Sequence, residues 1–322
     1  EVGSVVSGAA WETAPMVSIS GPFLALHDAQ RVDFYELQSD ETEFSPKFSR
    51  IESNPVLDVA IAESVSGEPL LVIVHEDSLE VIDGEQSPIE MTFSGAPFSI
   101  VTASGQLLAW ADTTAPQPTV NVTSLEGPRI AISLVLDAGA TEPQDEYLEQ
   151  ISGIAVDYEN AKVVDIAMDP LWVTAVVDVG PVNRTILINI LTGEQTMISE
   201  PVWPSSSPSV AHGRVAFLQI PLWDPSLDPE EIATARDVYL HDIEANTTLA
   251  ITHDDDVDQL DPQVLLEDVA WVEVDSDGKS SLKVYSGETF QPYSSVILQA
   301  AILMLIPLLF LWAYQAASER RG

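Results

Sequence analysis

The sequence repeats a pattern of short β-rich runs over most of its length. From Met16 onward, runs of aliphatic, threonine and aromatic residues alternate with clusters of Gly, Pro, Asn and Asp, and no 3.6-residue periodicity appears before residue 296. Such runs, bounded by turn residues, are typical of an all-β domain. Six such units recur at an average spacing of about 45 residues, the length of a four-stranded propeller blade. We therefore predict an all-β fold, a β-propeller with six blades, although the count could be five or seven because the units share a pattern rather than identical residues.

Two neighbouring stretches carry a family resemblance. Residues Ser207 to Asp256 include SPSVAHGRVAFLQI and DVYLHDIEANTTLAITHDDD, and LDPQVLLEDVAWVE follows at Leu260 to Glu273. An apolar strand after a small turn, an Asp-hydrophobic-aromatic-Leu strand and a Thr-ended strand follow one another. This order resembles the repeat of TolB-type β-propellers over residues 207–273, and the remainder matches by spacing alone. The Ser-Pro-Asp-Gly turn usual in that family appears only in part, at residues 275–278. The resemblance implies a six-bladed propeller that serves as an interaction platform, and it implies no enzyme active site.

A propeller needs its last blade completed, because otherwise edge strands stay unpaired. The N-terminal segment from Val2 to Trp11 contains a short β-branched run that could supply the missing strand. We therefore expect Val2 to Trp11 to close the ring on the last blade.

The chain is strongly acidic. Its 51 acidic and 12 basic residues give a formal net charge of −39. At low salt this charge would destabilise the compact state by self-repulsion, whereas at molar salt the Debye length falls to about 3 Å and screens it. The composition therefore favours a salt-adapted, haloarchaeal-like or marine surface protein, the alternative being an ordinary acidic surface protein that collects divalent cations. Nucleic acid is not an expected partner, since no basic patch is present.

An uncharged apolar run near the C-terminus predicts a membrane anchor. Residues Val296 to Ala317 form 22 consecutive residues without a charge, and a helix of about 33 Å would cross a bilayer core of about 30 Å. Arg320 and Arg321 follow directly, which favours a cytoplasmic C-terminus. A buried core helix and a tail-anchored topology are the alternatives. We predict a single-pass type I protein, its leader removed, with an extracellular propeller at 1–287, a tether at 288–295, a transmembrane helix at 296–317 and a cytoplasmic tail at 318–322.

Surface modification and metal binding give the candidate site residues. Three Asn-X-Ser/Thr sequons, at Asn121, Asn183 and Asn246, fit an extracellular glycoprotein. The chain contains no cysteine, which excludes disulfides and thiolate metal sites. The run HDDDVDQLD supplies alternate carboxylates of the kind that calcium prefers, and a solvated loop is the alternative reading. Its candidate calcium ligands are Asp254, Asp256, Asp258 and Asp261.

No catalytic signature is present, so the sequence favours a binding role. The five histidines occur singly, and neither a nucleophile elbow, a zinc-protease motif nor a phosphate-binding loop can be found. We expect an accessory or interaction subunit of a membrane or cell-surface complex, with the bilayer and other membrane proteins as partners and no cofactor besides calcium. One alternative is a propeller hydrolase or lyase, which would require Asp33, Asp58 or Asp165 to converge at a central channel. The other is a structural envelope protein.

Overall fold

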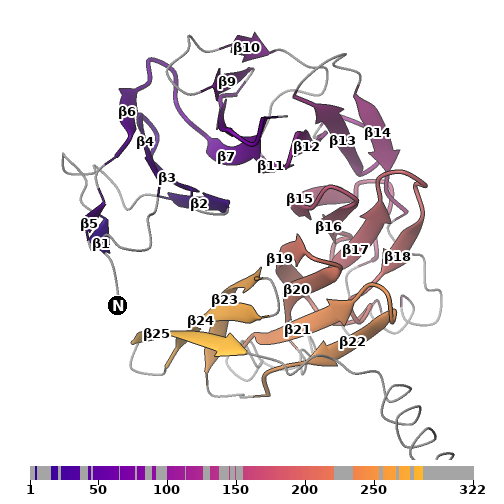
Figure 1. Cartoon of the computed structure of the whole chain (residues 1–322). Helices are drawn as coiled ribbons and strands as arrows, with labels where there is room; N and C mark the ends of the chain where they lie inside the picture. Colours follow the sequence, from indigo (N-terminus) through magenta and orange to yellow (C-terminus); the bar gives the residue numbers. More distant parts are fainter. Residues whose placement is uncertain are drawn as a thin grey trace, which may run out of the picture.

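The computed structural model consists of short antiparallel β-sheets that follow one another around a common centre (Figure 1). This arrangement confirms the predicted all-β class. The structure describes residues 4–5, 16–20, 23–36, 43–44, 46–64, 66–76, 78–83, 89–91, 100–112, 114–125, 131–137, 145, 149, 155–220, 235–253, 257–265, 268–275 and 279–285.

Apart from a two-stranded sheet of β1 (Ser4–Val5) and β5 (Glu43–Phe44), the described residues form six sheets in sequence order, here called blades 1 to 6. Blade 1 contains β2 (Met16–Ser20), β3 (Phe23–His27), β4 (Arg31–Glu36) and β6 (Phe48–Ile51). Blade 2 contains β7 (Asp58–Glu63), β8 (Pro69–Val74), β9 (Leu79–Asp83) and β10 (Ile89–Met91). Blade 3 contains β11 (Val101–Ser104), β12 (Leu107–Ala111), β13 (Thr119–Ser124) and β14 (Ile132–Val135).

The second half of the ring repeats this order. Blade 4 contains β15 (Lys162–Met168), β16 (Trp172–Asp178), β17 (Asn183–Asn189) and β18 (Gln195–Met197). Blade 5 contains β19 (Ser205–Ala211), β20 (Arg214–Gln219), β21 (Asp237–Asp242) and β22 (Thr247–Ala250). Blade 6 has three strands among the described residues, namely β23 (Asp258–Val264), β24 (Val269–Val274) and β25 (Ser280–Tyr285).

Turn chemistry explains why consecutive strands pair. Ala211 of β19 pairs with Arg214 of β20, so the connection is the two-residue loop His212-Gly213. Both loop residues have positive φ, 52° and 75°, as a type I′ turn requires. The right-handed twist of that turn matches the twist of the strands, so the local sequence sets the hairpin register.

Apolar contacts between neighbouring blades form the core. The middle strands β8 and β16 are buried along nearly their whole length, because both faces of each sheet are covered. Five clusters of buried residues each join one blade to the next, from blades 1 and 2 through blades 5 and 6. Trp110 lies in the cluster between blades 2 and 3, fully buried. The ring is therefore held together by successive pairwise interfaces.

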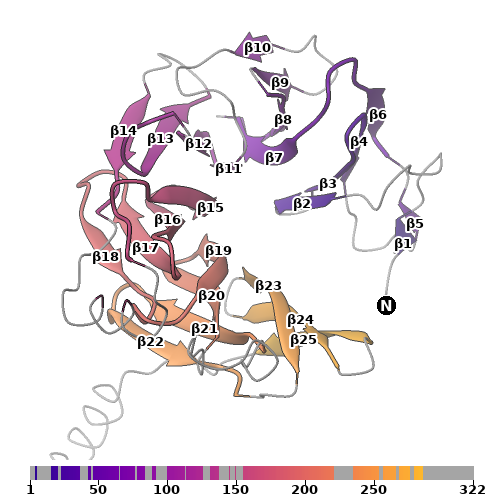
Figure 2. The same ribbon diagram turned by 180° about the vertical axis from the view of Figure 1, so that it is seen from behind.

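Among the residues that the structure describes, no strand pairing closes the ring. Of the predicted closing segment Val2 to Trp11, Ser4–Val5 form β1, which pairs in parallel with β5 (Glu43–Phe44) rather than with β25. In both views β1 and β5 lie beside blade 1, and a gap separates blade 1 from blade 6 (Figures 1 and 2). The predicted closure on the last blade is therefore wrong for the residues that the structure describes, since the nearer partner β5 takes the hydrogen bonds of β1.

The predicted anchor lies outside the described part of the chain. This applies to the tether 288–295, the helix Val296 to Ala317 and the tail 318–322. Within the described ranges no helix has the length and apolarity needed to cross a membrane. Membrane anchoring stays a prediction from sequence.

Replacing Trp110 by alanine tests the inter-blade core. Trp110→Ala should lower the free energy of unfolding by about 3–5 kcal/mol, because it leaves a large cavity between blades 2 and 3. Leu191→Ala is the matched control, since Leu191 is 78% exposed and its loss should cost less than about 0.5 kcal/mol. Urea unfolding at high salt measures both, and equal losses would contradict the packing described.

Candidate functional site

The first strand of each blade lies nearest the centre of the ring (Figures 1 and 2). Three of these inner strands, β15, β19 and β23, contain a β-bulge. Ser207 and Asp261 occupy equivalent places in the β19 and β23 bulges, each before a proline, with φ of 50° and 47°. Non-glycine residues, and residues before proline above all, rarely adopt this conformation. Each bulge bends its strand, so the backbone amide and the side chain at the bulge point in a different direction from those of a regular strand.

Two aspartates on inner strands join their blade to the next one. Asp58 begins β7, and its Oδ1 accepts a hydrogen bond from the Val59 amide at 2.8 Å. It also accepts from the amide of Val101 in β11 of blade 3. Asp165 in β15 accepts from its neighbour Ile166 and from the amide of Ser207 in blade 5. The left-handed Ser207 backbone thus serves to present its amide to a carboxylate of the preceding blade.

These carboxylates share one negative field. Burial, together with the charge of Asp165 and against the backbone hydrogen bonds, raises the pKa of Asp58 to about 6. Burial, together with the charge of Asp261 and likewise against backbone hydrogen bonds, raises the pKa of Asp165 to about 6. The Asp58 side chain is nevertheless 34% exposed, so a group entering the centre of the ring can reach it. Partly desolvated carboxylates of like charge favour a positively charged ligand or a proton.

A buried histidine lies against this field. His27 at the end of β3 is 1% exposed, and its Nε2 lies 3.8 Å from Oδ1 of Asp58. Burial lowers the pKa of His27, although the backbone hydrogen bond and charge of Asp28 oppose the effect. The imidazole is therefore neutral near pH 7 and does not compensate the charge of Asp58.

The structure brings together two of the three aspartates that the hydrolase alternative named. Asp58 and Asp165, on the inner strands of blades 2 and 4, lie close enough for the charge of Asp165 to act on Asp58. Asp33 belongs to β4, is fully buried, and forms a bidentate pair with Arg31 at 2.8 Å for both contacts. Asp261, which the sequence suggested as a calcium ligand, takes the third place instead. The sequence contains one signal for this arrangement. Ser207-Pro208 and Asp261-Pro262 occupy corresponding places in blades 5 and 6, and both pairs lie at a β-bulge.

The predicted calcium ligands are only partly described. Asp254 and Asp256 lie outside the described residues. Asp258 binds Arg236 through both oxygens, at 2.9 and 2.5 Å, and this hydrogen bonding lowers its pKa although burial opposes it. A calcium ion at Asp258 would have to displace Arg236, so calcium binding by this run stays a prediction.

The three sequons differ in exposure. Asn246 is exposed in the turn between β21 and β22, and Asn183 is half-buried at the start of β17. Asn121 in β13 is 4% exposed, and its Oδ1 accepts a hydrogen bond from Ser133 at 2.6 Å. A glycan on Asn121 would need this side chain to leave its strand, so Asn246 is the sequon best placed for modification.

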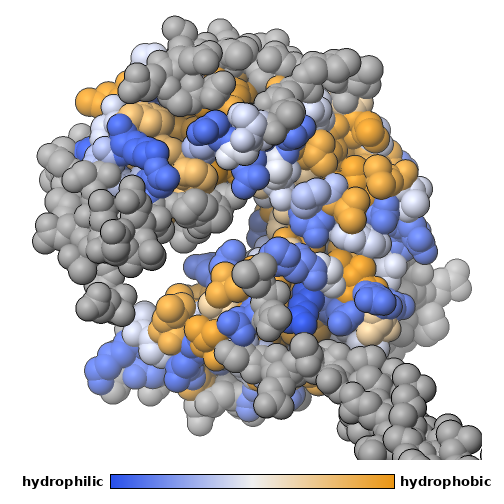
Figure 3. All heavy atoms as spheres, viewed as in Figure 1, coloured by the Kyte–Doolittle hydropathy of each residue, from blue (hydrophilic) through white to orange (hydrophobic). Residues whose placement is uncertain are grey.

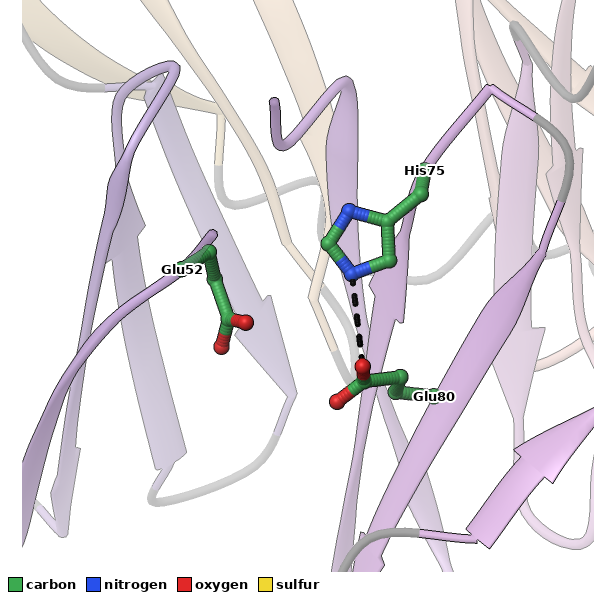
Figure 4. Close-up of side chains that lie close together, drawn as sticks. All are labelled: Glu52, His75 and Glu80. Atoms are coloured by element: carbon green, nitrogen blue, oxygen red, sulfur yellow. Dashed lines mark ion pairs between the residues drawn. The ribbon is translucent and has the colours of Figure 1, made fainter. Parts of the chain in front are cut away.

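A second group of titratable side chains lies between blades 1 and 2. Glu52, His75 and Glu80 each offer one ligand atom, and these atoms lie within 4.8 Å of one another (Figure 4). Among the described residues this group has the composition and spacing of a metal site. No sequence motif indicated it, because the three residues come from three separate segments.

Comparison with known proteins shows similarity of fold only. No protein-family model matches the sequence, and no curated protein is similar to it. The β-propeller domain of the Trilobed protease from Pyrococcus furiosus, which has an open velcro topology, shares 10% identity over 86% of this chain and 82% of its own, with a TM-score of 0.51. A puromycin-hydrolyzing peptidase from Mycobacterium tuberculosis shares 12% identity over 86% of this chain, with a TM-score of 0.51, and this chain spans 44% of that protein.

A putative TolB from Agrobacterium tumefaciens shares 13% identity over 74% of this chain and 80% of its own, with a TM-score of 0.47. At sequence identities this low, the similarity shows a common fold and gives no evidence about activity. The chain has a β-propeller fold, as its repeats suggested.

The raised pKa values predict how stability depends on pH. Because Asp58 and Asp165 have native pKa values of about 6, against about 3.9 when unfolded, the native state binds more protons between about pH 4 and 6. The free energy of unfolding should therefore fall as pH rises through this window and stay low above it. Asp58→Asn and Asp165→Asn should each stabilise the protein at pH 7.5 by about 1 kcal/mol, a value reduced for solvent exposure.

Urea unfolding between pH 4 and 8 measures this dependence. Glu194→Gln, at an exposed hairpin position, is the control for the loss of one negative charge, and it should change neither the stability nor the pH slope appreciably. Aspartate variants that are less stable than wild type at pH 7.5 and keep its slope would contradict the prediction.

Proposed function

We propose that this chain is a propeller binding module whose central carboxylates receive a positively charged group of a partner protein. The observation that carries the proposal is the shared negative field of the partly desolvated Asp58 and Asp165 on the inner strands. Asp261 adds to this field, although the positive charge of Arg236 offsets part of its contribution. In the space-filling view the centre is hollow, and the hollow continues outward between blades 1 and 6 (Figure 3). A side chain or extended segment of a partner therefore has a route to the centre.

A cationic partner group would gain energy from this site. A pKa raised by about two units means that the ionised carboxylate is destabilised relative to its protonated form by up to about 2.7 kcal/mol. Solvent screening of the exposed part of each side chain reduces this destabilisation to about 1 kcal/mol for each group. A ligand that restores both carboxylates to their ordinary pKa would recover about 2 kcal/mol, or roughly thirtyfold in affinity. Arginine suits this role because its planar guanidinium bonds carboxylates in pairs and remains charged at every relevant pH.

The predicted anchor suggests where the partner resides. If residues 296–317 span a membrane, the tether of residues 288–295 would keep the propeller within about 28 Å of the bilayer. A partner in the same membrane is then within reach, which supports an accessory subunit of a membrane complex.

A second candidate function is acid-base catalysis of hydrolysis or elimination. It is favoured by one observation, the 3.8 Å approach of neutral His27 to Asp58, whose pKa of about 6 suits proton transfer near neutral pH. Asp58→Asn would then abolish turnover, whereas a binding module would show no turnover to lose.

A peptide-binding experiment tests the main proposal. The full-length protein, solubilised in mild detergent at high salt, should bind an arginine-containing peptide and should release it below about pH 5, where Asp58 and Asp165 are protonated. The double variant Asp58→Asn/Asp165→Asn should bind at least about tenfold more weakly, and Glu194→Gln should bind like wild type. Equal affinity of the double variant and wild type would refute the central site.

Native gels of solubilised membranes test the accessory role separately. Wild type should migrate in a discrete complex with another membrane protein, and the double variant should migrate at about its own mass. If the wild-type chain migrates at about its own mass, the proposed membrane complex is wrong, whereas the result of the peptide-binding experiment is unaffected.

A further inference from the structure

Glu52, His75 and Glu80 meet where the outer part of blade 1 contacts blade 2. Glu52 follows β6, His75 follows β8, and Glu80 lies within β9 (Figure 4). In the close-up, Glu52 approaches from the neighbouring blade, while the imidazole of His75 points toward the carboxylate of Glu80. Glu52 and His75 are buried and Glu80 is half-buried, with donor atoms within 4.8 Å of one another.

His75 is oriented as a metal ligand would be. Its Nδ1 lies 3.0 Å from the backbone oxygen of Pro55, and a carbonyl oxygen can only accept, so Nδ1 carries the proton. In the neutral imidazole the lone pair is then on Nε2, and Nε2 has no hydrogen-bond partner among the described residues although His75 is only 3% exposed. Nε2 faces Oε1 of Glu80 at 3.8 Å. A backbone acceptor on the other ring nitrogen is the usual support of a metal-binding imidazole.

Among the described residues, two carboxylates and one arginine surround His75. Arg50 contacts both carboxylates, with Nε 2.7 Å from Oε1 of Glu52 and Nη2 2.8 Å from Oε2 of Glu80. With a neutral imidazole and both carboxylates ionised, one guanidinium leaves one net negative charge in a largely buried place, beside an acceptor nitrogen. The Arg50 side chain is 30% exposed, so it can move toward solvent when a cation enters.

We propose that Glu52, His75 and Glu80 form a binding site for a divalent transition-metal ion, with Zn²⁺ the ion that best fits. One imidazole nitrogen and two carboxylate oxygens match zinc sites with three protein ligands and one water. The nitrogen ligand disfavours Ca²⁺ and Mg²⁺, which prefer oxygen. Ligand atoms about 2.0 Å from a tetrahedral zinc lie about 3.3 Å apart, so the 3.8 Å separation of His75 and Glu80 needs only a small rotamer adjustment. The ion would join blade 1 to blade 2 and would take over the bridging role of Arg50.

Metal binding to the full-length protein tests the site. After dialysis against a chelator, the protein should bind one Zn²⁺ per chain in calorimetry, and bound Co²⁺ should give the visible absorption of a tetrahedral site. His75→Asn should lower Zn²⁺ affinity by more than about tenfold and abolish the Co²⁺ spectrum. His212→Asn, which removes an exposed imidazole from the β19–β20 turn, should leave both unchanged.

Arg50→Gln distinguishes a metal site from a structural ion-pair network. If the site is real, this variant should bind Zn²⁺ several-fold more tightly, because a competing positive charge is removed, and Zn²⁺ should restore the thermal stability that the variant loses. If Arg50 only bridges the blades, the variant will be less stable, Zn²⁺ will not restore it, and the proposal fails. Tight Zn²⁺ binding that persists in His75→Asn would also overturn it, since the ion would then be held elsewhere.

Discussion

The fold depends on the burial of both faces of each sheet. A strand such as β8 or β16 is apolar along its length, so its sheet cannot be stable with one face in water. Each blade therefore requires a neighbour on either side, and the five shared clusters supply this for every adjacent pair from blade 1 to blade 6. The outer face of blade 6 is the exception, because Leu282 and Val284 of β25 are 72% and 52% exposed. The edge of β25 also has no strand partner among the described residues.

The same interfaces place acidic groups in two different situations. At the centre, Asp58 and Asp165 accept amide hydrogen bonds from the next blade, so they contribute to blade contact while their like charges repel. At the outer side, Glu52 and Glu80 also meet between blades, but Arg50 lies between them. A carboxylate that accepts hydrogen bonds only from neutral backbone amides keeps its net negative charge, which a cationic ligand can then neutralise. The charge of a carboxylate paired with arginine is already neutralised. The central group is therefore the better candidate for binding a cationic partner, and the outer group for binding an ion that can replace an arginine.

The repeat, its six units and the strands within them could be predicted because they follow from local periodicity and turn residues. Closure could not, since a short β-branched run does not specify which strand edge it pairs with, and β1 pairs with β5 rather than with β25. Asp261 was assigned to a calcium run because neighbouring aspartates suggest it, and only the bulge in β23 shows that it belongs with Asp165. The metal group was missed because a single histidine, 23 residues after Glu52 in the sequence, forms no motif by itself.

Net charge alone says little about which of the 51 acidic residues take part in recognition. At molar salt the Debye length is about 3 Å, so the charges spread over the surface scarcely act on a partner beyond direct contact. Carboxylates that protein atoms partly desolvate are screened much less, and Asp58 and Asp165 show this by their pKa values of about 6. If the chain works at high salt, as its composition suggests, recognition has to rely on such sheltered charges. The ring then matters for the proposed function because it shelters Asp58 and Asp165 from the screening that weakens the charges on the surface.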